Sequence, residues 1–243
     1  MQNFPIYFYF RFVFLFVSSL FILTPLSAHA DSYQKQADAY WTQGKAFIKK
    51  GQYLKAAELF LKNAAAEKKS AKPREGYLSS AYYKAGDCYK HAGKFDKALI
   101  NFKNALAIDL KLKTPEQIII RNNGIASVYK ATGKYSQALQ FYEKTLLQAR
   151  KSKRMTDAAV VLNNIGLMYY KWGKPDTAID YYEQALQFHR KKGNQANISA
   201  VLNNMGLVYE EKGWYSKAIQ AFREALAIDR KRNLWLTALP PFL

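Results

Sequence analysis

The side chains that could catalyse a reaction or bind a metal are few in this chain and poorly spaced for either task. Of the three histidines, His29 lies in an apolar N-terminal segment, whereas His91 and His189 have no second ligand at metal-binding spacing. The sequence contains neither a His-Glu-Xaa-Xaa-His motif nor a Cys-Xaa-Xaa-Cys motif, and its serines and aspartates lack a histidine in a triad setting. We therefore predict that the protein is not an enzyme and uses no metal or cofactor.

Two glycine-containing stretches superficially resemble a phosphate-binding loop. They run from Gly86 to Lys94 and from Gly166 to Lys174. Six residues separate the glycines of each stretch, whereas the loop has four, and Phe95 and Pro175 stand where it needs a hydroxyl side chain. These glycines belong instead to an internal repeat.

The repeat occurs five times between Ser32 and Asn233, and its marker glycines are 42, 40, 40 and 40 residues apart. A small residue lies seven positions before each marker, and an aromatic residue lies four positions before it. In chain order the markers are Gly51, Gly93, Gly133, Gly173 and Gly213, the small residues are Gly44, Gly86, Ala126, Gly166 and Gly206, and the aromatics are Phe47, Tyr89, Tyr129, Tyr169 and Tyr209. Arrays of this period are solenoids.

Each column of the repeat has a physical role in a helical hairpin. The small residue and the aromatic lie one turn apart on one face of a first helix, so a second helix can approach closely there. The marker glycine supplies the left-handed conformation that ends the first helix. An alanine and a further aromatic follow, as Ala178 and Tyr182 do after Gly173, and present the complementary face of the second helix.

These columns resemble the tetratricopeptide repeat, whose pattern has a Leu-Gly pair, a Tyr, and further on an Ala, an aromatic and an Ala. The resemblance implies an all-α, right-handed solenoid of five helix-turn-helix repeats. They are expected at about residues 37–76, 79–114, 119–155, 159–194 and 199–233. The period of 40 exceeds the usual 34. With the Leu-Asn-Asn-Xaa-Gly strings at residues 162–166 and 202–206, it is similar to the longer subclass of kinesin light chains, polarity adaptors and many bacterial signalling proteins.

In that subclass the inner groove, lined by first helices, binds peptides or helices, so the resemblance implies a protein or peptide partner. By analogy we place eight residues in the groove: Trp41, Tyr83, Asn123, Asn163, Asn203, Lys90, Lys130 and Tyr170. The asparagines form a ladder that can donate to and accept from a peptide backbone. The alternative is that the asparagine pairs bond neighbouring helices. The full residue set that grips a terminal carboxylate in related repeats is missing.

Basic residues gather where the second helices end, and we call this set the basic rim: Arg150, Lys151, Arg190, Lys191, Lys192, Arg230, Lys231 and Arg232. The net charge is +19, or +18 without residues 1–30, which contain Arg11 as their only charged side chain. Cations suit helix C-termini, which explains the rim on structural grounds alone. The alternative is attraction to an anionic membrane or envelope surface. Nucleic acid is disfavoured because the chain carries an export signal.

That signal is the apolar run from Phe12 to Leu26, which is followed by Ala28-His29-Ala30, a small-Xaa-small cleavage pattern. The run is short for a membrane span. We therefore predict a signal peptide at residues 1–30 and an exported, periplasmic or secreted protein, with an uncleaved N-terminal anchor as the alternative.

At the other end, the repeat register predicts a new first helix near Leu234, but the chain continues as a short apolar tail, residues 234–243, that contains Pro240 and Pro241. Two prolines bar continuation of a helix. The tail is expected either to fold over the last repeat or to be a truncated sixth repeat of a longer, regulatory signalling protein.

Cys88 is the only cysteine. Its column elsewhere holds Val128, Met168 and Val208, all apolar, so the sequence predicts a packed thiol instead of a reactive one.

Overall fold

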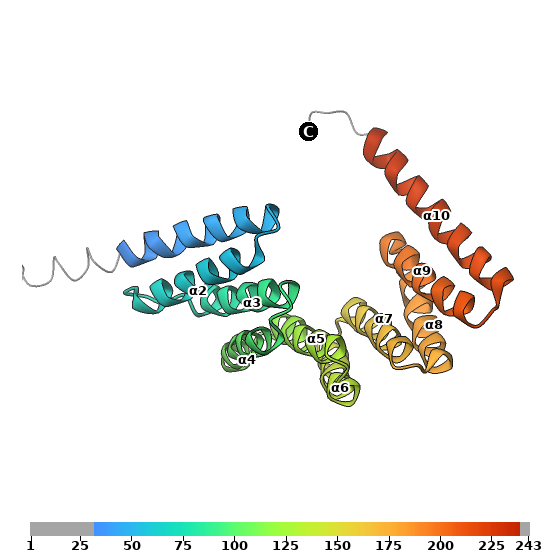
Figure 1. Ribbon diagram of the computed structural model, residues 1–243, viewed down its shortest axis with the longest axis horizontal. Coiled ribbons are helices and arrows are strands. Elements are labelled where there is room, and N and C mark those ends of the chain that lie inside the picture. The colour runs from blue at the N-terminus through green and yellow to red at the C-terminus, as the bar shows by residue number, and fades with distance from the viewer. Residues whose placement is uncertain (1–31, 239–243) are drawn as a thin grey trace, which may run out of the picture. The chain divides into compact units, whose positions relative to one another are not determined.

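The computed structural model describes residues 32–238, so the predicted signal peptide lies outside the described residues (Figure 1). This part of the chain is helical and contains no strand, which confirms the all-α prediction. The helices are residues 32–49, α2 (Tyr53–Lys69), α3 (Glu75–His91), α4 (Phe95–Leu112), α5 (Pro115–Ala131), α6 (Tyr135–Lys151), α7 (Met155–Lys171), α8 (Pro175–Lys191), α9 (Gln195–Glu211) and α10 (Tyr215–Ala238). No helix in residues 32–238 is both long enough and apolar enough to cross a membrane.

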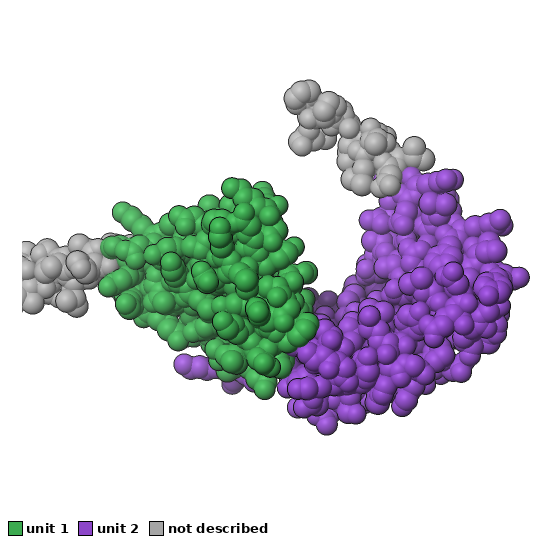
Figure 2. All heavy atoms as spheres, viewed as in Figure 1, with its two compact units in different colours: residues 1–108 green, residues 109–243 purple. Residues whose placement is uncertain are grey.

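The chain divides into two compact units, residues 1–108 and 109–243 (Figure 2). The first unit holds the helix of residues 32–49, α2, α3 and most of α4. The second holds α5 to α10, in which α7 contacts both α5 and α9. First helices of successive repeats are therefore neighbours within the second unit.

The marker glycines make the predicted left-handed turns. All five have φ between 69° and 73°. The residue after each marker donates its N–H to the carbonyl of the aromatic four positions before the marker, as Lys174 does to Tyr169 at 2.9 Å. This bond across six residues is the Schellman arrangement, which satisfies a carbonyl that the helix end would leave free.

The small-residue column brings the two helices of each hairpin into contact. A Cβ added at Gly166 would lie 2.7 Å from the Tyr182 ring and 3.1 Å from the Ala178 carbonyl oxygen. A Cβ at Gly206 would lie 2.5 Å from the Phe222 ring. Tyr182 is fully buried. The predicted close packing is confirmed, and the glycines that mimic a phosphate loop are packing and turn residues.

The last helix departs from the expectation. No turn follows Asn233, although that position corresponds to Gly193, which ends α8 with φ of 68°. Instead α10 continues through Asn233 to Ala238. No new first helix therefore opens at Leu234, because residues 233–238 extend α10.

The face of α10 that would meet a further repeat is open in the described residues. Ile219 and Leu226 are 51% and 49% exposed, whereas their counterparts one repeat earlier, Ile179 and Leu186, are 9% and 7% exposed. The burial of the earlier pair comes from the repeat that follows it.

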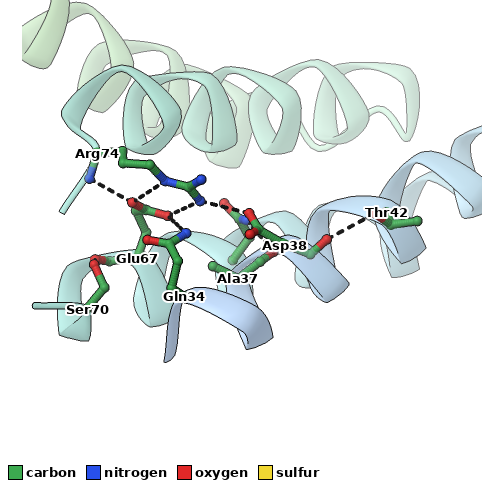
Figure 3. A network of polar contacts seen from close by, with 8 residues as sticks. Gln34, Ala37, Asp38, Thr42, Glu67, Ser70 and Arg74 are labelled. Atoms are coloured by element: carbon green, nitrogen blue, oxygen red, sulfur yellow. Dashed lines mark hydrogen bonds and ion pairs between the residues drawn. The ribbon is translucent and has the colours of Figure 1, made fainter. Parts of the chain in front are cut away.

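Each unit contains a buried carboxylate with polar partners. In the first, the fully buried Glu67 accepts hydrogen bonds from the Arg74 side chain and backbone and from Gln34, and Arg74 also pairs with Asp38 at 2.8 Å (Figure 3). Burial alone would raise the Glu67 pKa, but these hydrogen bonds outweigh it, and the pKa is lowered. The network joins Glu67, near the end of α2, to Arg74, the residue just before α3.

Candidate functional site

The asparagine ladder runs along the first helices α5, α7 and α9 of the second unit. Asn164 Nδ2 donates to Asn123 Oδ1 at 3.0 Å, and Asn204 Nδ2 donates to Asn163 Oδ1 at 3.0 Å. The amide nitrogens of Asn123 and Asn163, and the whole side chain of Asn203, make no hydrogen bond with the side chains and backbone described for residues 32–232. The ladder thus links successive repeats through its oxygens and keeps donors for another molecule.

The accessibility of the ladder rises along the chain. Asn123 and Asn163 are half-buried, and Asn203 is exposed. Leu207, one turn further along α9, is 47% exposed. The end of the ladder at α9 therefore offers both polar and apolar surface.

The two aromatics that occupy the ladder column in the first unit are packed side chains. Trp41 meets the Phe60 ring edge-on at 5.3 Å between centroids, and it packs against a small core of Ala64, Leu78 and Ala81. Tyr83 lies 5.3 Å from the Phe102 ring. Both are half-buried, so a large part of each ring contributes to the core of the first unit.

The remaining groove candidates carry local contacts of their own. Lys90 pairs with Asp87 at 2.8 Å, and Lys130 is half-buried. The Tyr170 hydroxyl bonds to the Glu211 carboxylate, and this hydrogen bond, with some burial, raises the Tyr170 pKa. Tyr170 also packs against the core of the second unit. Lys90 belongs to the first unit, whereas Lys130 and Tyr170 lie about two helical turns after Asn123 on α5 and Asn163 on α7.

The residues of the basic rim are all exposed, as the helix-end assignment requires. Two of them are paired: Arg190 with Glu224 at 2.7 Å and Arg232 with Asp229 at 3.1 Å. Surface pairs of this kind contribute less than about 1 kcal/mol each. The other rim residues have no carboxylate partner within residues 32–238.

The candidate reactive side chains are packed or stacked. Cys88 is 1% exposed, and burial, with the charge of Asp87, raises its pKa to about 11, which confirms the packed thiol. The His91 ring stacks on Tyr53 at 4.9 Å. His189 is 1% exposed, and burial lowers its pKa. In the described part of the chain, no three His, Cys, Asp or Glu side chains are grouped closely enough to hold a metal.

A polar residue that was not predicted recurs sixteen positions after the marker glycine in four of the five repeats. The column reads Glu67, Asp109, Ala149, His189 and Asp229; the first two and His189 are buried, whereas the Asp229 side chain is 40% exposed. Arg121 Nε donates to Asp109 at 2.9 Å with both side chains almost fully buried, and Ser199 Oγ donates to Asp229 at 2.7 Å. The available signal was a polar residue at the same register in four of five repeats. Because Glu67, Asp109 and Asp229 have different partners, these pairs could not be predicted from the repeat itself.

The successive helical hairpins match models of a known repeat family. Tetratricopeptide-repeat models match residues 79–112, 116–191 and 157–231, which together span more than half of the chain. The chain belongs to the tetratricopeptide-repeat family. A comparison with curated proteins gave no match.

Several solved structures share the fold of this tetratricopeptide-repeat chain. BtubC (BKLC) from P. vanneervenii is 21% identical with a TM-score of 0.67, and the match covers 90% of this chain and 94% of that one. A putative kinesin light chain repeat protein of Podosopora anserina is 17% identical with a TM-score of 0.65, covering 84% and 98%. The resemblance to kinesin light chain repeats is thereby confirmed at the level of the fold.

The third comparison is with a longer protein. The Rap conjugation gene regulator of plasmid pLS20, solved in complex with a Phr peptide, is 17% identical with a TM-score of 0.66. The match covers 80% of this chain and 53% of the Rap protein, so this chain spans about half of its length.

Proposed function

We propose that this protein is an exported, non-catalytic interaction module that binds a peptide or protein segment along the first helices α5, α7 and α9. The observation that carries the proposal is the ladder: within residues 32–232, the amide donors of Asn123 and Asn163 and the whole side chain of Asn203 make no hydrogen bond. An extended peptide offers backbone carbonyls to such donors whatever its sequence.

The family gives this proposal further support. Tetratricopeptide repeats serve widely as protein-binding scaffolds, and a structural neighbour of similar fold is a Rap protein in complex with a peptide. The partner of this chain is proposed to be a protein or peptide, held without a metal or cofactor. Within the same proposal, a regulatory role in a longer signalling protein is the alternative biological setting.

The proposal that the protein is exported is supported by its sequence alone. The apolar run of residues 12–26 and the Ala28-His29-Ala30 pattern support secretion with cleavage near Ala30. An N-terminally anchored form would place the same helices on the outer side of a membrane. N-terminal sequencing of the protein recovered from the cell envelope separates the two forms.

The role of the ladder in binding can be tested with peptides from a displayed random library that have been selected for binding to the wild-type chain. Replacing Asn123, Asn163 and Asn203 together with alanine is expected to weaken binding roughly tenfold to a thousandfold, because three hydrogen bonds of about 0.5–1.5 kcal/mol each are lost. Circular dichroism should show unchanged helical content. Isothermal titration of the selected peptides gives the affinities.

The matched control for this experiment replaces Asn164 and Asn204 with alanine. These residues donate to the ladder from within the protein, so their loss removes the links between repeats and leaves all three ladder side chains in place. We expect lower stability with retained binding. If the control loses binding as fully as the triple variant, the asparagines act by holding the repeats together.

A second candidate function is attachment to an anionic surface, which the solvent exposure of every basic-rim residue favours. Replacing Lys191, Lys192 and Lys231 with glutamine is expected to reduce sedimentation with phosphatidylserine vesicles by about tenfold or more, because each basic residue near such a surface contributes about 1 kcal/mol. Added salt should weaken the wild type more than the variant, since screening acts over about 8 Å at physiological ionic strength.

The control for the rim makes the same charge change elsewhere in the second unit. Lys134, Lys144 and Lys171 are exposed and lie outside the rim. Equal loss of sedimentation by both triple variants would indicate a net-charge effect and would remove the rim as a distinct attachment site.

A further inference from the structure

A pocket of about 530 Å³ opens between α8 and α10, over α9. Its apolar wall is made by Leu186 of α8, Leu202, Met205 and Tyr209 of α9, and Ala221 of α10. The volume lies in the range of about 300–1,000 Å³ that small-ligand pockets occupy. All of its lining residues belong to the second unit, so the pocket does not depend on how the two units are placed.

The repeat explains why the pocket is present at this position. Ala221 lies eight residues after its marker glycine, and the same column holds Phe141 in the third repeat and Tyr181 in the fourth. The Tyr181 ring stacks on Tyr169 with centroids 5.4 Å apart and planes 14° from parallel. The Phe141 ring lies 5.7 Å from Tyr129. In the fifth repeat an alanine therefore stands where its two predecessors place an aromatic ring.

The tyrosine that such a ring would contact is kept in the fifth repeat. Tyr169 stacks with both Trp172 and Tyr181, whereas Tyr209 contacts Trp214 at 5.9 Å and has Ala221 in the place of the second ring. Tyr209 remains half-buried, and it lines the pocket together with Met205. An aromatic pair of this kind stabilises a contact by more than the burial of its apolar area alone would.

The charged residues that line the pocket favour an uncharged occupant. These residues are Glu183, Glu224, Arg190 and Lys217. Arg190 Nη2 forms an ion pair with Glu224 at 2.7 Å. The Lys217 ammonium lies over the Tyr209 and Trp214 rings, at 5.8 Å and 4.6 Å from their centroids. Two acidic and two basic groups leave no net charge to attract an ion.

We propose that this pocket receives an aromatic side chain of a partner protein, which stacks on Tyr209 as Tyr181 stacks on Tyr169 inside the fourth repeat. The site is separate from the ladder. Leu202, Met205 and Tyr209 share one face of α9 at spacings of three and four residues, and Asn203 lies on another. The pocket thus provides an anchor point on a second surface of the same repeats.

The test uses the full chain with its methionine methyl groups labelled with carbon-13, and N-acetyl-tyrosine amide as the probe. The Met205 methyl resonance is expected to shift in a saturating manner with a dissociation constant of about 1 mM, as suits a ligand of this size. Met155 and Met168 do not line the pocket and should not shift. N-acetyl-leucine amide should bind at least tenfold more weakly, because it has no ring to stack.

The decisive variant is Ala221→Tyr, which restores the aromatic that the third and fourth repeats carry. It should retain the wild-type unfolding midpoint or raise it, and it should weaken probe binding at least tenfold. Ala227→Tyr makes the same change at an exposed position of α10 outside the pocket and should bind the probe as the wild type does.

Three results would overturn the proposal: no saturating Met205 shift up to the solubility of the probe, equal binding of the leucine and tyrosine amides, or equal binding by the wild type and a folded Ala221→Tyr variant. If Ala221→Tyr does not fold, the aromatic does not fit and the proposal also fails. The alanine variant of Asn123, Asn163 and Asn203 should bind the probe normally, so failure of the pocket and failure of the ladder are distinguishable.

Discussion

Replacing Arg121 with methionine is expected to destabilise the second unit by about 3–5 kcal/mol, the usual effect of removing one partner from a buried ion pair. The Arg121 and Asp109 side chains are 4% and 2% exposed, and Nε lies 2.9 Å from Oδ2. Methionine fills much of the same volume but cannot donate, so the Asp109 carboxylate would remain buried without its cation. The free energy of unfolding, from urea denaturation monitored by circular dichroism, measures the effect.

The matched control is Arg154→Met. Arg154 pairs with Asp157 and Glu116 at the surface, where all three side chains are at least one-third exposed. Exposed pairs contribute about 0–1 kcal/mol, so this variant should unfold close to the wild type. Equal destabilisation by the two variants would mean that loss of a long side chain, and not a stranded buried charge, explains the Arg121 result.

Gly166→Leu is expected to be the second most damaging change. The first carbon of the new side chain would lie 2.7 Å from Tyr182 and 3.1 Å from a backbone oxygen, and Tyr182 is fully buried. Overpacking typically costs about 1–3 kcal/mol, and we expect the upper end because the neighbouring backbone cannot move aside as a flexible side chain can. Urea denaturation gives the loss of stability directly.

Gly76→Leu provides the comparison for this substitution. Gly76 lies in the first turn of α3 with nothing within 4 Å of an added Cβ. The change there should be neutral or slightly stabilising, because leucine favours a helix more than glycine does. A Gly166 variant that unfolds at the wild-type urea concentration would contradict the close packing assigned to the small-residue column.

The hairpins could be predicted because each depends on residues that are close in sequence. Gly173 ends a helix through its own left-handed conformation, and Gly166 meets Tyr182 only 16 residues later. The packed state of Cys88 followed in the same way from the apolar residues in its column. Local and periodic constraints of this kind recur in every copy, so five copies reinforce one another.

The candidate site was less predictable because it depends on what each side chain meets in the next repeat. The sequence placed Asn123 and Asn163 in one column, but their bonds to Asn164 and Asn204 depend on the spacing between adjacent first helices. Trp41 shares that column and packs against Phe60 instead. The extension of α10 through Asn233 was missed for a related reason, since register alone does not enforce a turn.

The central claim is that partners bind along α5, α7 and α9, and position-resolved cross-linking tests it most directly. A photoreactive phenylalanine derivative is placed at Asn203 of α9 or, in a separate protein, at the exposed Lys144 of α6, and each protein is irradiated with a peptide selected on the wild type. Our account predicts a covalent adduct from position 203 and little from position 144, with mass spectrometry giving the yield. Adducts formed mainly from position 144 would contradict it.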